Sequence, residues 1–231
     1  MTRSRKPAVA ARPGQPPAGG VLVTGFEPFG GEDVNPSWEI CRRLPAAIGR
    51  SRIGTLLVPT VYRRAVDVVA LAIEESEPSL VIMLGQAGGR ACVSVERVAI
   101  NVDDARIADN AGAQPVDEPV VPAGPAAYFA TVPVKAMVAA IRASDIPAEV
   151  SNTAGTFVCN HLMYGVLHFL AASGRKARAG FIHVPWLERQ ALTHAGEPAM
   201  ALATMARAVE AAVAAALENA VDLKLAAGKL D

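Results

Sequence analysis

The sequence has no excess of charge of either sign. Lysine plus arginine and aspartate plus glutamate each number 22, so the formal net charge is zero. Without a strongly basic surface, nucleic acid and anionic membranes are not expected as main partners. A neutral chain also lacks the repulsion that discourages self-association, so we expect a homo-oligomer.

Cysteine is scarce, and long apolar runs are missing. The three cysteines, Cys41, Cys92 and Cys159, match no metal-binding spacing and form no even-numbered disulfide set. This usage is typical of a reducing compartment, so we expect a cytoplasmic protein. No apolar run reaches the roughly 20 residues that span a bilayer. Residues 1–19 are basic and rich in Pro, Gly and Ala without the apolar segment of a signal peptide, so we expect a disordered tail there and a C-terminal tail over residues 221–231.

What the chain does contain is apolar residues in the patterns of strands and helices. Hydrophobic residues make up 52% of it, which suits a well-buried α/β domain. We expect strands at residues 21–25, 55–59, 79–85, 148–151 and 179–185, an extended segment at 93–101, helices at 35–44, 62–75, 134–143, 158–172 and 198–217, and an irregular segment at 103–131. Because strands alternate with helices without a linker or repeat, we predict one α/β domain over residues 20–220, an α/β/α sandwich around a twisted, largely parallel, mixed sheet.

One cysteine stands where a nucleophile would be placed. Cys159 follows a predicted strand and a polar, Gly-bearing turn, and it begins an amphipathic helix. The start of a helix carries partial positive charge and unpaired N–H groups, which favour a thiolate and could hold an oxyanion. Ligands in such sheets bind outside the carboxyl ends of the strands, where Gly25-Phe26, Gly85-Gln86 and His183 are also expected. We therefore predict a cysteine nucleophile at this rim.

The four histidines are unequal candidates for its base. His161 lies two positions after Cys159 and points to another face of the helix, and His168 lies more than two turns away. His194 falls in a polar region and is expected to be exposed. His183 ends an apolar strand at the rim and is favoured, although a satisfied core histidine would look the same.

The carboxylates are less decisive. Glu96 belongs to a charged pair inside an apolar, β-like run, so it could orient the imidazole or simply face water on a half-buried strand. Asp103, Asp104 and Asp109 match no known metal-loop spacing, so no metal site is expected.

Five motifs in collinear order resemble the pyroglutamyl peptidase I family, peptidase family C15. They are Gly25–Gly31 with Asn35-Pro36-Ser37, Gly85–Arg90, Glu96–Asn101, Ser151–His161 and Gly180–Pro185. The resemblance covers about residues 20–220. It implies a cysteine exopeptidase, an omega peptidase, that removes an N-terminal pyroglutamyl residue from small peptides through a thioester, without cofactor or metal. The family is commonly homo-oligomeric, often tetrameric.

The resemblance also assigns roles. It implies Cys159 as nucleophile, His183 as base, Glu96 as the acid that orients the imidazole, and Arg106 at the oxyanion site. The implied substrate pocket is lined by Phe26, Phe29, Gln86, Ile107, Phe157 and Val158. Such a pocket suits a flat, neutral lactam, which needs apolar walls together with a donor and an acceptor for the ring amide.

Two other readings compete with this one. Similar α/β sheets host nucleoside phosphorylases and hydrolases, which need an anion site, and the Gly88-Gly89-Arg90 loop is the candidate for it. A non-catalytic protein that binds pyroglutamate is the other alternative.

Overall fold

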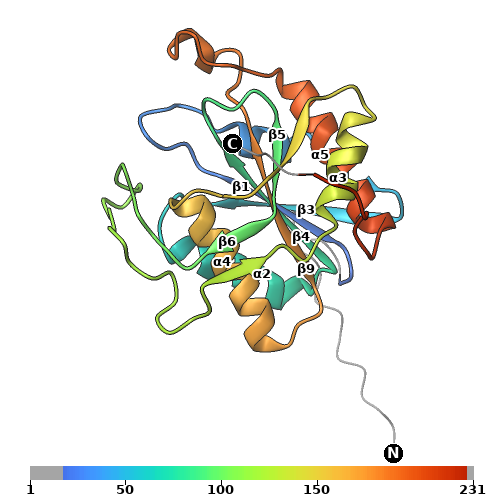
Figure 1. Ribbon diagram of the computed structural model, residues 1–231, viewed down its shortest axis with the longest axis horizontal. Helices are drawn as coiled ribbons and strands as arrows, with labels where there is room; N and C mark the ends of the chain where they lie inside the picture. The colour runs from blue at the N-terminus through green and yellow to red at the C-terminus, as the bar shows by residue number, and fades with distance from the viewer. Residues whose placement is uncertain (1–17, 228–231) are drawn as a thin grey trace, which may run out of the picture.

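In the computed structural model, which describes residues 18–227, a central sheet lies between two layers of helices (Figure 1). The seven strands of the main sheet have the order β2-β3-β1-β4-β9-β5-β8, and β6 and β7 form a separate pair. The strands are β1 Val21–Phe26, β2 Ala47–Ile48, β3 Ser51–Val58, β4 Leu80–Gln86, β5 Val93–Glu96, β6 Val98–Ile100, β7 Ala127–Phe129, β8 Ala148–Ser151 and β9 Arg178–Val184. The helices are α1 Pro36–Cys41, α2 Arg64–Ser76, α3 Val134–Arg142, α4 Val158–Ser173, the 3-10 turn η1 Gln190–Leu192, and α5 Leu202–Glu218.

The main sheet is largely parallel, as predicted. β1 pairs in parallel with β3 and β4, β4 with β9, and β5 with β8. The antiparallel pairs are β5 with β9 and the short β2 with β3. β1 and β4 are buried along their whole length, which explains their uninterrupted apolar sequences.

Each face of the sheet has its own core. Ile40 of α1, Met137 of α3 and Val209 of α5 belong to one apolar cluster, with Leu84 of β4. The other face is covered by α2 and α4, whose apolar side chains pack with Met83 of β4 in a second cluster. The predicted α/β/α sandwich is therefore confirmed. Within residues 18–227, no helix is long and apolar enough to cross a membrane.

Several boundaries differ from expectation for local reasons. Helix α1 is shorter than predicted: the Asn35 side chain caps it by accepting from the Ser37 N–H at 3.1 Å, and it ends at Cys41. Helix α5 begins at Leu202 rather than 198, because Ala199 and Met200 pair with Trp186 instead of joining the helix.

The extended and irregular segments also differ from expectation. The predicted extended segment 93–101 divides at Arg97 into β5 and β6. The expected irregular segment 103–131 contains β7, which pairs with β6 through contacts that are distant in sequence. The expected N-terminal tail lies outside the described residues except for 18 and 19.

Candidate active site

The thiol of Cys159 lies directly over the sheet. Cys159 is the second residue of α4, and Phe157 precedes that helix in an extended conformation. A Cβ atom placed on Gly85 of β4 would come within 2.9 Å of the Cys159 sulfur and 2.7 Å of the Phe181 ring. Gly85 therefore leaves the space that the Cys159 thiol occupies.

His183 lies beside this thiol, on the neighbouring strand β9. In the parallel register of β4 and β9, Gly85 is the partner of His183, and neighbouring strands lie about 4.8 Å apart. Cys159 and His183 both line one cavity. Within the described residues no hydrogen bond joins the sulfur to the imidazole, so the pair is adjacent but not locked together.

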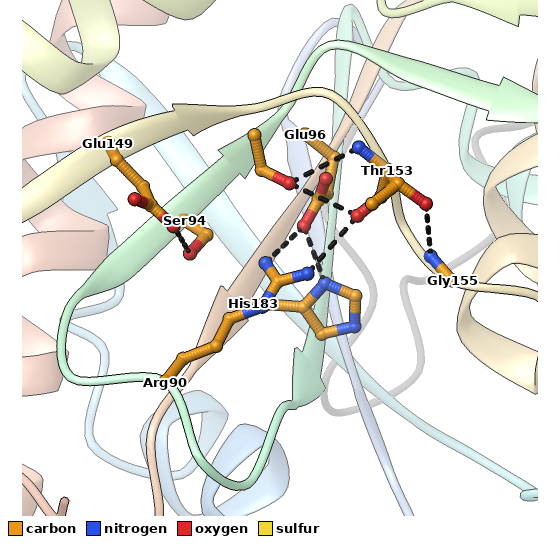
Figure 2. Close-up of polar contacts among 8 residues, drawn as sticks. Arg90, Ser94, Glu96, Glu149, Thr153, Gly155 and His183 are labelled. Atoms are coloured by element: carbon orange, nitrogen blue, oxygen red, sulfur yellow. Dashed lines mark hydrogen bonds and ion pairs between the residues drawn. The ribbon is translucent and has the colours of Figure 1, made fainter. Parts of the chain in front are cut away.

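Glu96 contacts the imidazole of His183 at Nδ1. The antiparallel pairing of β5 with β9 brings Glu96 opposite Phe181, and its Oε1 lies 2.8 Å from Nδ1 of His183 (Figure 2). Glu96 is fully buried and His183 is 4% exposed. Because the ionised carboxylate can only accept, Nδ1 carries the proton and Nε2 is left as the reactive nitrogen.

Arg90 supplies a second partner for the same carboxylate. Its Nη1 lies 2.7 Å from Oε1 of Glu96, and its Nη2 donates to the Thr153 carbonyl at 3.1 Å (Figure 2). Burial raises the pKa of Glu96, but the hydrogen bond and charge of His183 and the charge of Arg90 outweigh it and hold that pKa below its ordinary value. Glu96 is therefore ionised at neutral pH.

The surroundings of Cys159 favour the protonated thiol. Burial, followed by the negative charge of Glu96, raises the pKa of Cys159 to about 12, and the Arg90 charge opposes this only in part. The start of α4 favours a thiolate, as the sequence indicates, but desolvation works against it. A thiolate requires transfer of its proton to a neighbouring base.

A cavity of about 820 Å³ opens beside Cys159 and His183. Four of the six predicted pocket residues line it: Phe29, Gln86, Ile107 and Phe157. Arg106, predicted for the oxyanion site, lines it as well. Phe26 and Val158 do not. They are buried behind its wall at 2% and 0% exposure, within the core that α2 and α4 cover. Phe26 is the last residue of β1, and the Gly/Pro loop begins only after it.

Gln86 presents its backbone rather than its carboxamide to this cavity. Side chains alternate along a strand, so Gln86 points away from the face on which Gly85 meets Cys159, and its Oε1 accepts from Gln190 Nε2 at 3.1 Å. Ala87 donates to Val184 of β9, so the N–H and C=O of Gln86 point toward β1. The pairing of β1 with β4 stops at Thr24 and Met83, short of Gln86.

The other histidines have other partners. Nδ1 of His161 lies 2.8 Å from Asp103, and its Nε2 accepts from the Arg63 N–H at 2.8 Å. His168 Nδ1 lies 2.9 Å from the Tyr128 hydroxyl. These contacts occupy both rings away from Cys159, as the sequence analysis expected.

Some residues that line the cavity were not predicted from the sequence. His194, expected to be exposed, instead stacks on Trp186 at 4.1 Å and bonds to Glu32, so it lines the cavity with Glu197. Their positions depend on the fold of the 186–197 segment, for which the sequence gives no signal. Arg90 was visible as the end of a Gly-Gly-Arg loop, but nothing in the sequence pairs it with Glu96. Within residues 18–227, no group of three or more His, Cys, Asp or Glu could hold a metal ion.

Known proteins share the sequence and the fold of this chain. The family model described as pyroglutamyl peptidase matches residues 20–219. The chain is 58% identical over 211 residues to a pyrrolidone-carboxylate peptidase of Klebsiella pneumoniae, covering 90% of this chain and 98% of the relative. The crystal structure of pyroglutamyl peptidase I from Bacillus amyloliquefaciens superposes with a TM-score of 0.86 at 44% identity, covering 89% of this chain and 100% of that one. The pyrrolidone carboxyl peptidase of Thermococcus litoralis superposes with a TM-score of 0.85 at 38% identity, covering 90% and 99%. The chain belongs to the pyroglutamyl peptidase family, peptidase family C15.

Proposed function

We propose that this protein is a cysteine omega peptidase that hydrolyses the bond after an N-terminal pyroglutamyl residue of small peptides. The observation that carries the proposal is the placement of the Cys159 thiol over Gly85, beside a His183 imidazole that Glu96 holds at 2.8 Å. This is the arrangement of nucleophile, base and orienting acid that acyl transfer needs. The names of the relatives, pyrrolidone-carboxylate and pyroglutamyl peptidases, agree with this substrate class.

The first half of the proposed reaction forms a thioester. Nε2 of His183 takes the proton of Cys159 as the sulfur attacks the pyroglutamyl carbonyl. The negative oxygen that develops is met by the Cys159 backbone N–H, at the start of α4, and by Arg106 from the cavity wall. The tetrahedral adduct collapses as His183 gives its proton to the departing amine. This leaves the pyroglutamyl group on sulfur.

The second half hydrolyses that thioester. A water molecule loses a proton to His183 as its oxygen attacks the thioester carbonyl, and the C–S bond then breaks. Sulfur leaves as a thiolate and recovers a proton from the imidazolium, which restores both groups. Glu96 stabilises the imidazolium in each half without itself becoming protonated, since its pKa is held low.

The cavity offers what a lactam requires. Phe29 and Phe157 lie with ring centroids 5.9 Å apart and, with Ile107, make an apolar wall. The backbone N–H and C=O of Gln86, which extend beyond the sheet pairing on the β1 side, can meet the ring C=O and N–H of a cis amide. We propose that this pair of backbone contacts, rather than the Gln86 carboxamide, reads the lactam.

The decisive experiment combines the nucleophile with the specificity. We expect the wild type to release the reporter from a pyroglutamyl amide, to leave the matching prolyl amide intact because proline lacks the ring carbonyl, and to lose activity on alkylation by iodoacetamide. Cys159→Ala should lower turnover by a factor of about 10³ or more. Cys92→Ala is the matched control, because Cys92 is a free thiol outside the cavity lining. Near-normal turnover by Cys159→Ala would remove the nucleophile assignment.

A phosphorolytic enzyme is not favoured by the site. Its anion would have to bind at the Gly88-Gly89-Arg90 loop, but the guanidinium of Arg90 is engaged by Glu96 and the Thr153 carbonyl. Activity on the pyroglutamyl amide should therefore be independent of phosphate. Turnover by the wild type also separates an enzyme from a non-catalytic pyroglutamate-binding protein.

We further propose that the protein works in the cytoplasm as a homotetramer. Cys41, Cys92 and Cys159 are all free, which agrees with a reducing compartment. Zero net charge and apolar side chains exposed around the 103–131 segment, such as Val116 at 66% and Phe129 at 67%, favour self-association. Light scattering of the eluting protein measures the assembly directly.

A further inference from the structure

Arg90 takes part in no chemical step of the reaction proposed above, yet it reaches the centre of the site. It comes from the loop between β4 and β5 and lines the cavity. Its guanidinium spans two elements, with Nη1 at 2.7 Å from Glu96 on β5 and Nη2 at 3.1 Å from the Thr153 carbonyl (Figure 2). Thr153 belongs to the turn that leads into α4 and Cys159.

In its contact with Glu96, Arg90 shares one carboxylate oxygen with His183. Arg90 and His183 both bond to the same oxygen, Oε1, while Oε2 has no hydrogen-bond partner among the described residues. A fully buried carboxylate needs a positive charge nearby to remain ionised. His183 supplies that charge only when it is protonated, whereas Arg90 supplies it at every working pH.

The contact with Thr153 ties the same charge to the nucleophile's turn. The Thr153 N–H donates to Oγ of Ser151 at 3.3 Å, and the Gly155 N–H donates to the Thr153 side chain at 3.0 Å. Gly155 has φ +77°, a conformation that favours glycine. The turn is thus closed on itself, and Arg90 holds it against the β5 carboxylate. One planar guanidinium fork therefore sets the spacing between the acid and the nucleophile.

We propose that Arg90 is a positioning residue that balances the charge of Glu96 and thereby sets the pH range in which the Cys159–His183 pair works. This inference rests on the proposed function. With Arg90 present, the buried carboxylate and guanidinium sum to zero, and the thiol and imidazole exchange a proton in a neutral surrounding. Without it, one uncompensated negative charge favours every protonated form nearby. Both protonation steps of the coupled pair must then move to higher pH.

Other charged or titratable groups also surround the pair, and replacing Arg90 leaves their side chains in place. They are Asp104 and Arg106 from the 103–131 segment, His194 and Glu197 from the 186–197 segment, Tyr62 beside Phe157, and Glu149 on β8, which bonds to Ser94. None of the other cations among them bonds to Glu96, so none replaces the lost contact.

The test is the pH dependence of kcat/KM on a pyroglutamyl amide. Arg90→Met keeps the length of the side chain and removes its charge, and we expect both limbs of the profile to move to higher pH by about one unit. Arg90→Lys keeps the charge but loses the fork, so its limbs should stay near those of the wild type while kcat falls. Arg43→Met is the control, because it removes an exposed charge outside the cavity.

The pH profile of Arg90→Met can refute the proposal, and alkylation of Cys159 provides a second readout. If the limbs of Arg90→Met coincide with those of the wild type while kcat falls, Arg90 only supports the structure and the proposal is wrong. If Arg90→Met is too slow to assay, the pH dependence of Cys159 alkylation replaces turnover, with the same shift expected. That second readout does not depend on the substrate, so a wild type without peptidase activity would refute the proposed function and still leave the effect of Arg90 measurable.

Discussion

At the scale of single residues, Gly85 is the position where the fold and the chemistry meet most closely. A Cβ atom there would lie 2.7 Å from the Phe181 ring and 2.9 Å from the Cys159 sulfur. We therefore expect Gly85→Ala to displace the thiol and lower kcat/KM by about 10². The slower alkylation of Cys159 by iodoacetamide checks the same displacement without substrate.

The matched control is a clash elsewhere in the sheet. A Cβ atom on Gly180 of β9 would meet Val132 at 2.3 Å, on the face away from Cys159. Gly180→Ala should lower the melting temperature at least as much as Gly85→Ala while its remaining folded protein keeps normal alkylation. Equal alkylation by both variants would show that Gly85 has no special relation to the thiol.

Some residues of the site can be predicted from the sequence and others cannot. The positions of Cys159 and His183 are predictable because local patterns show them: Cys159 begins a helix after a polar turn, and His183 lies near the end of an apolar strand. The link between Arg90 and Glu96 is not, because it joins a loop to a buried strand through side-chain geometry. Phe26 shows the opposite error. Its motif continues into a loop, but the residue itself completes β1 and packs in the core.

At the scale of elements, helix α4 carries Cys159, the proposed nucleophile, and we expect that the helix terminus alone does not ionise its thiol. Burial raises the pKa of Cys159 to about 12, so very little thiolate forms at pH 7 unless a base takes the proton. We expect His183→Gln to slow the alkylation of Cys159 at neutral pH by at least about 10². The rate should recover as pH rises, because a raised thiol pKa means that the thiolate appears only in alkaline solution.

The measurement is the alkylation rate of the wild type and the variant between pH 6 and roughly 10. His168→Gln is the control, because it lies on α4 itself and its ring contacts Tyr128 rather than the cavity. A His183→Gln profile equal to that of the wild type would mean that the helix terminus is sufficient to form the thiolate.

The elements themselves were largely predictable, and the exceptions share one cause. The strands β1, β4 and β9 and the helices α2, α3 and α4 follow continuous apolar patterns that local sequence shows. β7 and the late start of α5 depend on pairing with distant partners, Val98 to Ile100 for β7 and Trp186 for residues 199–200. The antiparallel insertion of β5 next to β9, which brings Glu96 to His183, is likewise a property of the assembled sheet.

At the scale of the whole molecule, the described C-terminal residues pack against the domain through contacts with helix α3 and Arg97. Helix α3 has no cap from its own N-terminal neighbours. Instead Asp222 accepts from the Lys135 and Ala136 N–H groups, each at 3.0 Å, across more than 80 residues of chain. Close by in sequence, the Ala227 carbonyl accepts from Arg97 at 2.6 Å. An ordinary helix N-cap function is therefore supplied here by tertiary structure.

This cap yields a prediction that separates stability from catalysis. Asp222→Ala leaves two N–H groups of α3 without their acceptor and should cost about 1 kcal/mol of unfolding free energy, which corresponds to a melting temperature lower by about 2–4 °C in a domain of this size. Asp222→Asn keeps one acceptor oxygen and should lose less, and Lys224→Ala, in the same exposed stretch, should lose nothing measurable. Because α3 packs on the face of the sheet opposite to Cys159, kcat/KM at 25 °C should be unchanged in all three variants. A lower kcat/KM for Asp222→Ala at full folding would show that the C-terminal closure also shapes the site, while an unchanged melting temperature would mean that water caps α3 equally well.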